Sequence, residues 1–302
     1  MTPATRRQFL QSTLAGSAGL AFASSSARAI EPIQRNGKAH LRLSIAAYSY
    51  RKYLNLKQSK PSMTLDDFIR AAAEMGLDAV EPTQYYFPET SPRYLAHLKG
   101  LCTRLGLDVS GTAVGNNFCV PDPAKLREQI ASVKQWVEHT SRLGGKTIRI
   151  FAGPLSKGDT EEQARSRCIE AIQEACDHAG KFGIYLALEN HGGIVATIDQ
   201  MLRVVKAVKH EWFGVNWDTG NFRSPDPYVD LTRLAPYAVT VQIKTEIQRG
   251  PRMPKEEADL KRLTGILRAA DYRGYIALEY EAEEDPKTAV PRAIKELKQL
   301  MG

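Results

Sequence analysis

A glycine followed within two residues by a short apolar run recurs along the chain and constrains its fold more than any other feature. The glycines are Gly76, Gly106, Gly145, Gly183, Gly214 and Gly274. Each one ends a stretch with helical periodicity, where a glycine C-cap stops the helix and a strand can begin. Repeated helix-to-strand transitions of this kind predict an α/β fold with a parallel sheet.

The apolar runs predict eight strands, at residues 41–47, 79–81, 109–112, 147–151, 184–189, 214–218, 239–243 and 275–279. The expected helices start after Thr64 and Ser91 and cover residues 121–143, 160–182, 197–209, 227–234, 255–270 and 286–301. This alternation predicts a single-domain (β/α)8 TIM barrel, whose chemistry lies at the carboxyl ends of the strands. A doubly wound open sheet is the alternative, but no Gly-x-Gly-x-x-Gly motif follows the first strand to support it.

The first 29 residues have the features of an export signal. Arg6 and Arg7 are followed by Phe-Leu, a weakly apolar stretch at residues 14–23 and a small-x-small cleavage site at residues 27–29. We therefore expect a twin-arginine signal peptide at residues 1–29, an N-terminal linker at 30–40 and the barrel at 41–302. The apolar stretch is too short to span a bilayer, so the mature protein is expected in the periplasm without stable membrane association.

Charge and cysteine content argue against several classes of protein. Without residues 1–29 the formal net charge falls from +7 to +4, which is modest, and the lysines and arginines are spread along the expected helices, so a nucleic-acid groove is not expected. The four cysteines show no Cys-x-x-Cys spacing. Core thiols are therefore favoured over a zinc site or a disulfide framework, although one non-local disulfide stays open in an oxidising compartment.

Several of the expected strands end in an acidic residue. Residues 185–189 (Tyr-Leu-Ala-Leu-Glu) and 275–279 (Tyr-Ile-Ala-Leu-Glu) are nearly identical and end in Glu189 and Glu279, and Asp218 ends a third strand. Because the tips of parallel barrel strands open onto one face, these carboxylates are expected to share a metal ion and to exchange protons with a substrate. The alternative is ordinary core strands ending in solvated acids, and the third occurrence argues against it.

Two longer motifs lie at these strand tips. They are Leu-Glu-Asn-His-Gly-Gly at residues 188–193 and Asp-Thr-Gly-Asn at residues 218–221. Together with Glu279 they resemble the xylose isomerase-like barrels, a superfamily of sugar isomerases and epimerases, over nearly the whole chain after residue 29. Members of that superfamily hold one divalent metal ion, commonly manganese, with Glu, Asp, His and Glu from strands five to eight. The resemblance therefore implies that Glu189, Asp218 and Glu279 are metal ligands.

Strand seven departs from the pattern of this superfamily. Its members usually have His-Leu-Lys-Asp there, whereas this chain has Gln-Ile-Lys-Thr at residues 242–245. With Gln242 as fourth ligand, three carboxylates and one amide oxygen suit Mn²⁺ or Mg²⁺ better than Zn²⁺, which favours nitrogen and sulfur. Mn²⁺ is therefore the expected ion, with Mg²⁺ and Zn²⁺ as alternatives. The other interpretation is that Gln242 binds substrate and water fills the fourth position.

The resemblance also implies a mechanism. The substrate's oxygens bind the metal, one of Glu189 and Glu279 removes a carbon-bound proton, and the other returns it to an enediolate intermediate. His191 is expected either to contact the substrate or to be held structurally beside Gly192. Further candidate substrate contacts, each equally open to a structural hydrogen bond, are Gln84, Asn116, Asn117, Arg149 and Lys244.

Three classes of function fit these residues. The first is a metal-dependent sugar isomerase or epimerase, and the second is a metal-dependent lyase or dehydratase acting on 3-oxo sugars or 3-oxo glycosides. An exported location favours the second class over any sugar-phosphate pathway. The third is a non-catalytic sugar-binding barrel. Each class binds a small carbohydrate. The sequence does not determine the oligomeric state, and a homo-oligomer is one possibility. An endonuclease is disfavoured because the six histidines show no metal-ligand spacing.

Replacing Arg6 and Arg7 by lysine tests the export signal. Because the paired arginines are the part of the signal that the export machinery reads, the double variant should accumulate in the cytoplasm as the uncleaved precursor. Immunoblots of periplasmic and cytoplasmic fractions measure this distribution. Unimpaired secretion of the lysine variant would contradict the assignment of residues 1–29.

Overall fold

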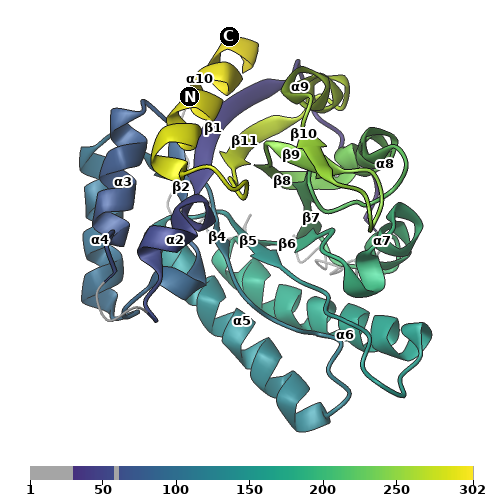
Figure 1. Ribbon diagram of the computed structural model, residues 1–302. Coiled ribbons are helices and arrows are strands. Elements are labelled where there is room, and N and C mark those ends of the chain that lie inside the picture. Colours follow the sequence, from purple (N-terminus) through teal and green to yellow (C-terminus); the bar gives the residue numbers. More distant parts are fainter. Residues whose placement is uncertain (1–29, 58–60, 302) are drawn as a thin grey trace, which may run out of the picture.

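Helices surround a parallel sheet that is rolled into a nearly closed barrel in the computed structural model, which describes residues 30–57 and 61–301 (Figure 1). The barrel strands of this described chain are β1 (His40–Ala46), β2 (Ala79–Glu81), β3 (Asp108–Val109), β4 (Thr112–Ala113), β5 (Thr147–Ile150), β6 (Tyr185–Glu189), β7 (Phe213–Asp218), β8 (Ala238–Ile243) and β11 (Arg273–Leu278). The expected (β/α)8 barrel is confirmed.

The helices follow one another round the outside of the sheet, so that each lies near the strands on either side of it in the sequence (Figure 1). They are α2 (Arg51–Leu54), α3 (Leu65–Glu74), α4 (Pro92–Arg104), α5 (Pro123–Leu143), α6 (Glu161–Ala179), α7 (Ile198–Val205), α8 (Pro227–Leu234), α9 (Leu260–Ala269) and α10 (Pro286–Met301). This arrangement places the apolar core between the sheet and the helix ring and leaves the two ends of the barrel to solvent.

Several helices begin where the sequence places a capping residue. The Thr64 hydroxyl accepts a hydrogen bond from the Asp67 amide, and the Asp67 carboxylate accepts one from the Thr64 amide. The same reciprocal pair of hydrogen bonds lies at the start of α6, at Thr160, and at the start of α7, at Thr197. Each pair satisfies two backbone donors that a helix start otherwise leaves without partners, so these boundaries are local properties of the sequence.

The third barrel strand is broken in two, where a single strand at 109–112 was expected. β3 pairs with β2, whereas β4 pairs with β5, so the two pieces form the two edges of the rolled sheet. A parallel bridge between Thr83 and Ala113 brings the edges together. Gly111 lies at the break and approaches β5 closely, since a Cβ there would lie 2.2 Å from Thr147 Oγ1 and 2.7 Å from the Thr147 carbonyl oxygen.

A small hairpin replaces the first turn of the helix that was expected at 255–270. Lys255–Glu257 (β10) pairs antiparallel with Glu246–Gln248 (β9), and the helix α9 begins only at Leu260 after its cap residue Asp259. The expectation of a helix from residue 255 was therefore wrong. Pairing with β9 outweighs the helical preference of a Lys-Glu-Glu sequence, because secondary-structure propensity is a weak influence that tertiary contacts override.

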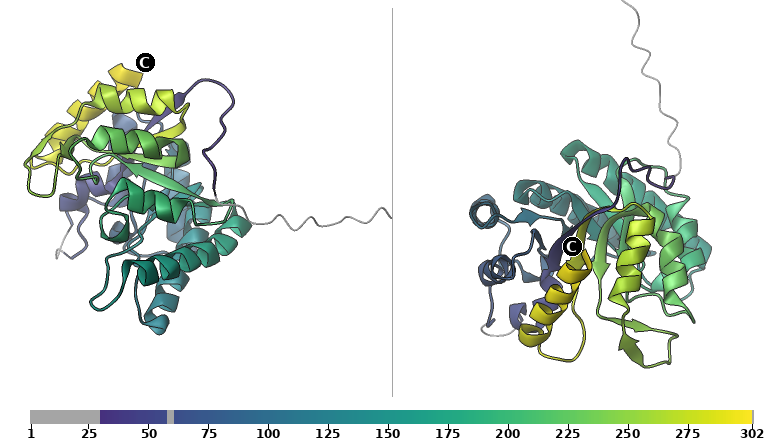
Figure 2. Two further views of the ribbon diagram at one scale, coloured as in Figure 1. Left: turned by 90° about the vertical axis from the view of Figure 1, so that its right-hand side faces the viewer. Right: turned by 90° about the horizontal axis from the view of Figure 1, so that it is seen from above.

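Residues 30–39, expected as a linker, run without regular structure along the amino-terminal ends of the strands. The Ile33 amide donates to the Pro236 carbonyl at 2.9 Å, and the Arg35 guanidinium donates to the carbonyl oxygens of Ala238 and Ala270. Figure 2 shows this segment on the opposite side of the barrel from the β9–β10 hairpin. The expected signal peptide at 1–29 lies outside the described residues.

Two further expectations concern the described chain as a whole. The four cysteines are buried free thiols, as expected for core residues. Within residues 30–57 and 61–301, no helix combines the length and the apolar composition that crossing a bilayer requires.

A pair of glycine substitutions tests whether the close approach to β5 requires glycine at residue 111. Gly111→Ala should destabilise the protein by about 1–3 kcal/mol, because its methyl group meets backbone that cannot move away easily. Gly265→Ala is the control: this exposed position inside α9 has open space around a Cβ, so alanine should add about 0.5–1 kcal/mol of stability. Urea denaturation measures both changes, and equal stability of the two variants would contradict the account.

Candidate functional site

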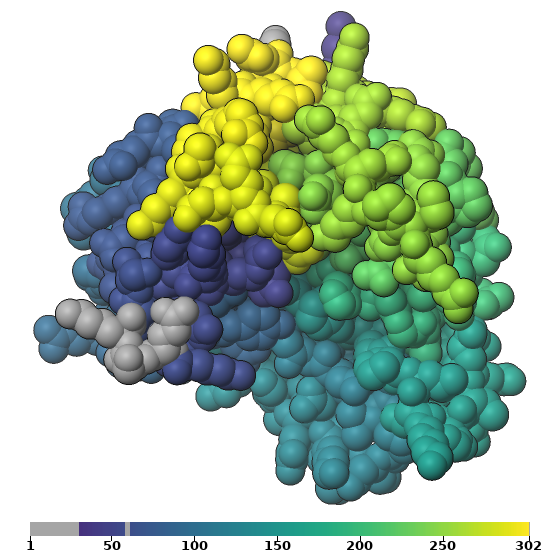
Figure 3. All heavy atoms as spheres, in the orientation of Figure 1, coloured from purple at the N-terminus to yellow at the C-terminus, as the bar shows by residue number. Residues whose placement is uncertain are grey.

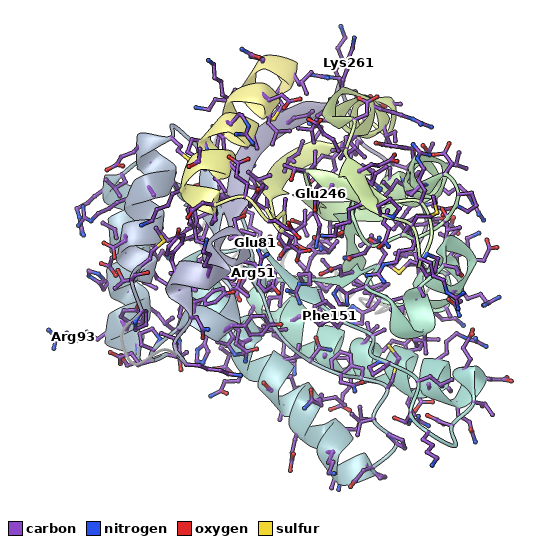
Figure 4. All side chains as sticks on the ribbon, viewed as in Figure 1. Arg51, Glu81, Arg93, Phe151, Glu246 and Lys261 are labelled. Atoms are coloured by element: carbon purple, nitrogen blue, oxygen red, sulfur yellow. The ribbon has the colours of Figure 1, made fainter. Side chains whose placement is uncertain are left out.

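Charged side chains gather at the end of the barrel where the strands finish. In Figure 4, Arg51, Glu81, Phe151 and Glu246 lie around the centre of this face, whereas Arg93 points outward from the helix ring. The strand register explains the gathering. Glu189 stands beside Asn216 and Asp218 stands beside Gln242, so polar residues on neighbouring strands reach the barrel mouth at the same level.

Glu189 forms one ion pair and accepts one hydrogen bond while almost fully buried, with 2% of its surface exposed. Arg149 Nε lies 2.9 Å from Glu189 Oε2, and Asn221 Nδ2 donates to Glu189 Oε1 at 2.8 Å. Burial raises the pKa of the Glu189 carboxyl to about 7; Arg149 opposes this rise and Glu279 adds to it. A carboxyl group with a pKa close to neutrality is suited to both accepting and returning a proton.

Lys244 places its ammonium group among three carboxylates. The Nζ atom lies 2.9 Å from Glu281 Oε2, 3.0 Å from Glu279 Oε2 and 3.4 Å from Asp218 Oδ2. Burial lowers the pKa of Lys244, but these carboxylates outweigh it and hold that pKa well above its usual value. Burial also raises the pKa of Asp218 well above its usual range, against the effect of Lys244. The ammonium is therefore a fixed positive charge and cannot act as a base at neutral pH.

Gln242 joins two other buried residues through both ends of its amide. Its Oε1 accepts a hydrogen bond from Asn216 Nδ2 at 2.7 Å, and its Nε2 donates to Glu81 Oε1 at 2.6 Å. Burial raises the pKa of Glu81 to about 7, and the bond from Gln242 works against that rise. The sequence analysis missed Glu81 as a site residue. The signal was present, because residues 79–81 are another short apolar run that ends in a glutamate.

Three amides that were candidate substrate contacts form hydrogen bonds with backbone, and their contact with substrate stays a prediction. Asn116 accepts from the Phe151 amide and donates to the Phe151 carbonyl, which fastens two loops of the barrel mouth together. Asn117 Oδ1 accepts from the Cys119 amide at 2.9 Å, and Gln84 Oε1 accepts from the Gly115 amide at 3.0 Å. Their structural role is to shape the loops around the charged cluster.

A cavity of about 630 Å³ is linked to Glu189 through Asn221, although Glu189 itself does not line it. Its lining includes Phe151 and His191, whose ring centroids lie 4.6 Å apart, and Asn221, which holds Glu189. Burial together with Lys244 and Arg149 lowers the pKa of His191, so this imidazole is neutral at pH 7. In the space-filling view the segments that surround the mouth come from both ends of the chain, with residues near 50 touching α10 (Figure 3).

A family model described as "Xylose isomerase-like TIM barrel" matches residues 69–300 of this chain. The chain belongs to the xylose isomerase-like TIM barrel family. The matched segment contains the carboxylates of the mouth, from Glu81 to Glu281. No curated protein sequence gives a significant match.

Solved structures agree with this assignment of the fold. The 3-keto-D-glucoside 4-epimerase of E. coli is 16% identical with a TM-score of 0.65, over 87% of this chain and 100% of that one. The probable 3-DHS dehydratase of Bacillus anthracis is 16% identical with a TM-score of 0.63, over 86% and 98%. A xylose isomerase-like barrel of Mycobacterium smegmatis, in complex with magnesium, is 18% identical with a TM-score of 0.67, over 86% and 96%. Identities this low establish the fold alone.

A divalent ion needs several side-chain oxygens that are free to bind it, and the carboxylates at the barrel mouth can be compared with this requirement. Glu189, Asp218 and Glu279 reach one face as expected, but Arg149 pairs with the first and Lys244 pairs with the other two. Both the oxygen and the nitrogen of the Gln242 amide already have hydrogen-bond partners. Among residues 30–57 and 61–301, no group of three or more His, Cys, Asp or Glu side chains is arranged to hold a metal ion. In this arrangement the residues do not fit such an ion, and the Mn²⁺ ligand set stays a prediction.

Replacing Gln242 by methionine tests the buried amide bridge. The substitution keeps the length of the side chain but leaves Glu81 and Asn216 each without a partner, which costs about 1–3 kcal/mol per buried group. Urea denaturation should therefore show a loss of stability. The control Gln299→Met changes an exposed residue of α10 and should alter stability by less than about 0.5 kcal/mol. Equal stability of both variants would show that the bridge contributes nothing.

Proposed function

We propose that this protein is a carbohydrate isomerase or epimerase that moves a proton on the carbon atom beside a carbonyl group. The observation that supports this most is a buried carboxyl group with a pKa of about 7, Glu189, placed near a second buried carboxylate, Glu279, and the buried ammonium of Lys244. Buried groups with shifted pKa values next to a cavity are candidates for acid and base catalysis. Epimerases among the solved structures of the same fold add support.

The reaction needs a base, an acid and a stabilised oxyanion. In the proposal the ionised carboxylate of one glutamate removes the carbon-bound proton, and the other glutamate returns a proton to the same or the neighbouring carbon. Two acid and base groups on different sides of the substrate allow the configuration of that carbon to change. Lys244 and Arg149 supply fixed positive charge for the oxygen that becomes negative, in a site from which water is largely excluded.

The cavity beside Glu189 suits a carbohydrate. Phe151 offers an aromatic ring against which the apolar face of a sugar packs, and the neutral imidazole of His191 both donates and accepts hydrogen bonds. Arg223 and Asn221 line the same cavity and add polar contacts for hydroxyl groups. A cavity of about 630 Å³ lies within the usual range for small-molecule sites.

The second candidate is a lyase or dehydratase that acts on a 3-oxo sugar or 3-oxo glycoside. This cavity favours it, because it extends from Asn221 over Phe151 and His191 to Pro251 and leaves room for a leaving group beyond the reacting carbon. A dehydratase has the same fold. Elimination uses the same first step, removal of the proton beside the carbonyl, and differs only in the loss of a substituent from the next carbon.

Glutamine substitutions at Glu189 and Glu279 test the proposal. Glutamine keeps an oxygen of similar reach but cannot accept a proton at neutral pH, so each variant should retain substrate binding yet lose about 10²-fold to 10⁴-fold in rate. The measurement is exchange of the substrate's carbon-bound hydrogen with deuterated solvent, followed by NMR. Free sugars, 3-oxo sugars and 3-oxo glycosides are screened, each with excess Mn²⁺ and with EDTA.

The exposed residue Glu174 on α6 supplies the matched control. Glu174→Gln removes a carboxylate that pairs with Lys134 far from the mouth, so its exchange rate should equal that of the wild type. Exchange without a released product supports the isomerase or epimerase, and exchange with a released substituent supports the lyase. If both glutamate variants exchange as fast as the wild type, neither residue is the base and the proposal fails.

A further inference from the structure

We propose that the ammonium group of Lys244, together with Gln242 in place of the superfamily's histidine, substitutes for a divalent metal ion in this barrel, so that the protein neither binds nor needs one. The proposal concerns three carboxylates at the mouth, Asp218, Glu279 and Glu281, which surround the Lys244 Nζ atom at 2.9–3.4 Å. The ammonium pairs with one oxygen of each carboxylate, and a divalent cation, which needs carboxylate oxygens at about 2.0–2.6 Å, would lie close to this positive charge.

Lys244 is built into this position by the residues around it. Its backbone amide donates to the Thr219 hydroxyl at 2.8 Å, which fixes the start of the side chain. The stem then passes over Gly220, where a Cβ would lie 2.7 Å from Lys244 Cδ. Only 7% of the side chain is exposed. A glycine in the Asp-Thr-Gly-Asn turn therefore provides the space that the lysine stem needs to reach the carboxylates.

The other members of the expected ligand set are also engaged. Arg149 pairs with Glu189 at 2.9 Å and is itself fixed by a bond from its Nη1 to the Val114 carbonyl at 2.7 Å. Gln242 uses its oxygen to accept from Asn216 and its nitrogen to donate to Glu81. Two permanent cations thus occupy the carboxylates, and the fourth position offers an amide that already has both of its partners.

The two cations also provide the charge that the chemistry requires, and this part rests on the proposed function. When a glutamate takes the carbon-bound proton, the electron pair of the C–H bond forms a carbon-carbon double bond and a carbonyl electron pair moves onto oxygen. Positive groups already fixed in place stabilise that oxygen without rearranging. Lys244 and Arg149 are such groups. Proton donation by the other glutamate forms the new C–H bond and re-forms the carbonyl, and the two glutamates end with exchanged protonation states that proton exchange with solvent resets.

Metal binding is measured on the full chain independently of any activity. After dialysis against EDTA and incubation with Mn²⁺, wild-type protein should carry far less than one ion per chain by elemental analysis. Its melting temperature should not change at about 1 mM Mn²⁺, Mg²⁺ or Zn²⁺, whereas a site with a Kd of about 10 µM would raise it clearly. One stoichiometric ion per wild-type chain would overturn the proposal.

A lysine substitution provides the converse test. Lys244→Met removes the ammonium and leaves buried carboxylates without a cation, so this variant should gain Mn²⁺ binding, seen as a fall in the free-ion EPR signal and a rise in melting temperature with Mn²⁺. Adding Gln242→His should strengthen the binding. Lys134→Met, at the exposed pair with Glu174, is the control and should bind no ion. If Lys244→Met does not fold, the wild-type measurements still decide.

The two proposals fail separately. Stoichiometric Mn²⁺ in the wild type, with solvent exchange that stops in EDTA, overturns the role of Lys244 and leaves the isomerase or epimerase intact. Wild-type protein that binds no ion and exchanges no tested carbohydrate supports the ammonium site and argues against the proposed function. Exchange that persists in EDTA supports both.

Discussion

Buried charge is tolerated only where each charged group has a partner of the opposite sign, and the mouth of this barrel depends on that condition. Removing one member of a buried ion pair leaves a charge that burial penalises heavily. Arg149 and Lys244 therefore stabilise the positions of Glu189, Asp218 and Glu279 as much as those carboxylates stabilise the two cations. The ends of β5, β6, β7, β8 and β11 are held in register by these pairs as well as by backbone hydrogen bonds.

Much of the fold could be predicted because its determinants are local. The capping pair at Thr64, the proline that opens α8 and the glycines before each strand all act within a few residues of their own position. The break in the third strand could not be foreseen, since it depends on the different neighbouring strands with which its two pieces pair. The β9–β10 hairpin depends likewise on a partner segment, and Lys-Glu-Glu in isolation favours a helix.

The positions of the acidic residues of the site could be predicted from the sequence, as much of the fold could. Parallel strands end at one face, so acidic tips such as Glu189 and Glu279 had to come close to one another. Which groups they pair with was not predictable, because that depends on side chains from three or four strands together. Asn116 illustrates the difficulty: an amide at a strand tip is equally able to bind a sugar hydroxyl or the backbone of Phe151, and only the loop geometry decides between them.

The pairing of β1 with β11 has a consequence for how the protein is made. The first strand of the barrel lies beside the last, in parallel from His40 and Arg273 onward. During synthesis β1 can pair with β2 early, but its other neighbour, β11, becomes available only when nearly the whole chain has left the ribosome, at about 5–20 residues per second. Glu279 directly follows β11, so Lys244 acquires that counter-charge only when the barrel closes. Closure of the barrel and the pairing of Lys244 with Glu279 therefore happen together.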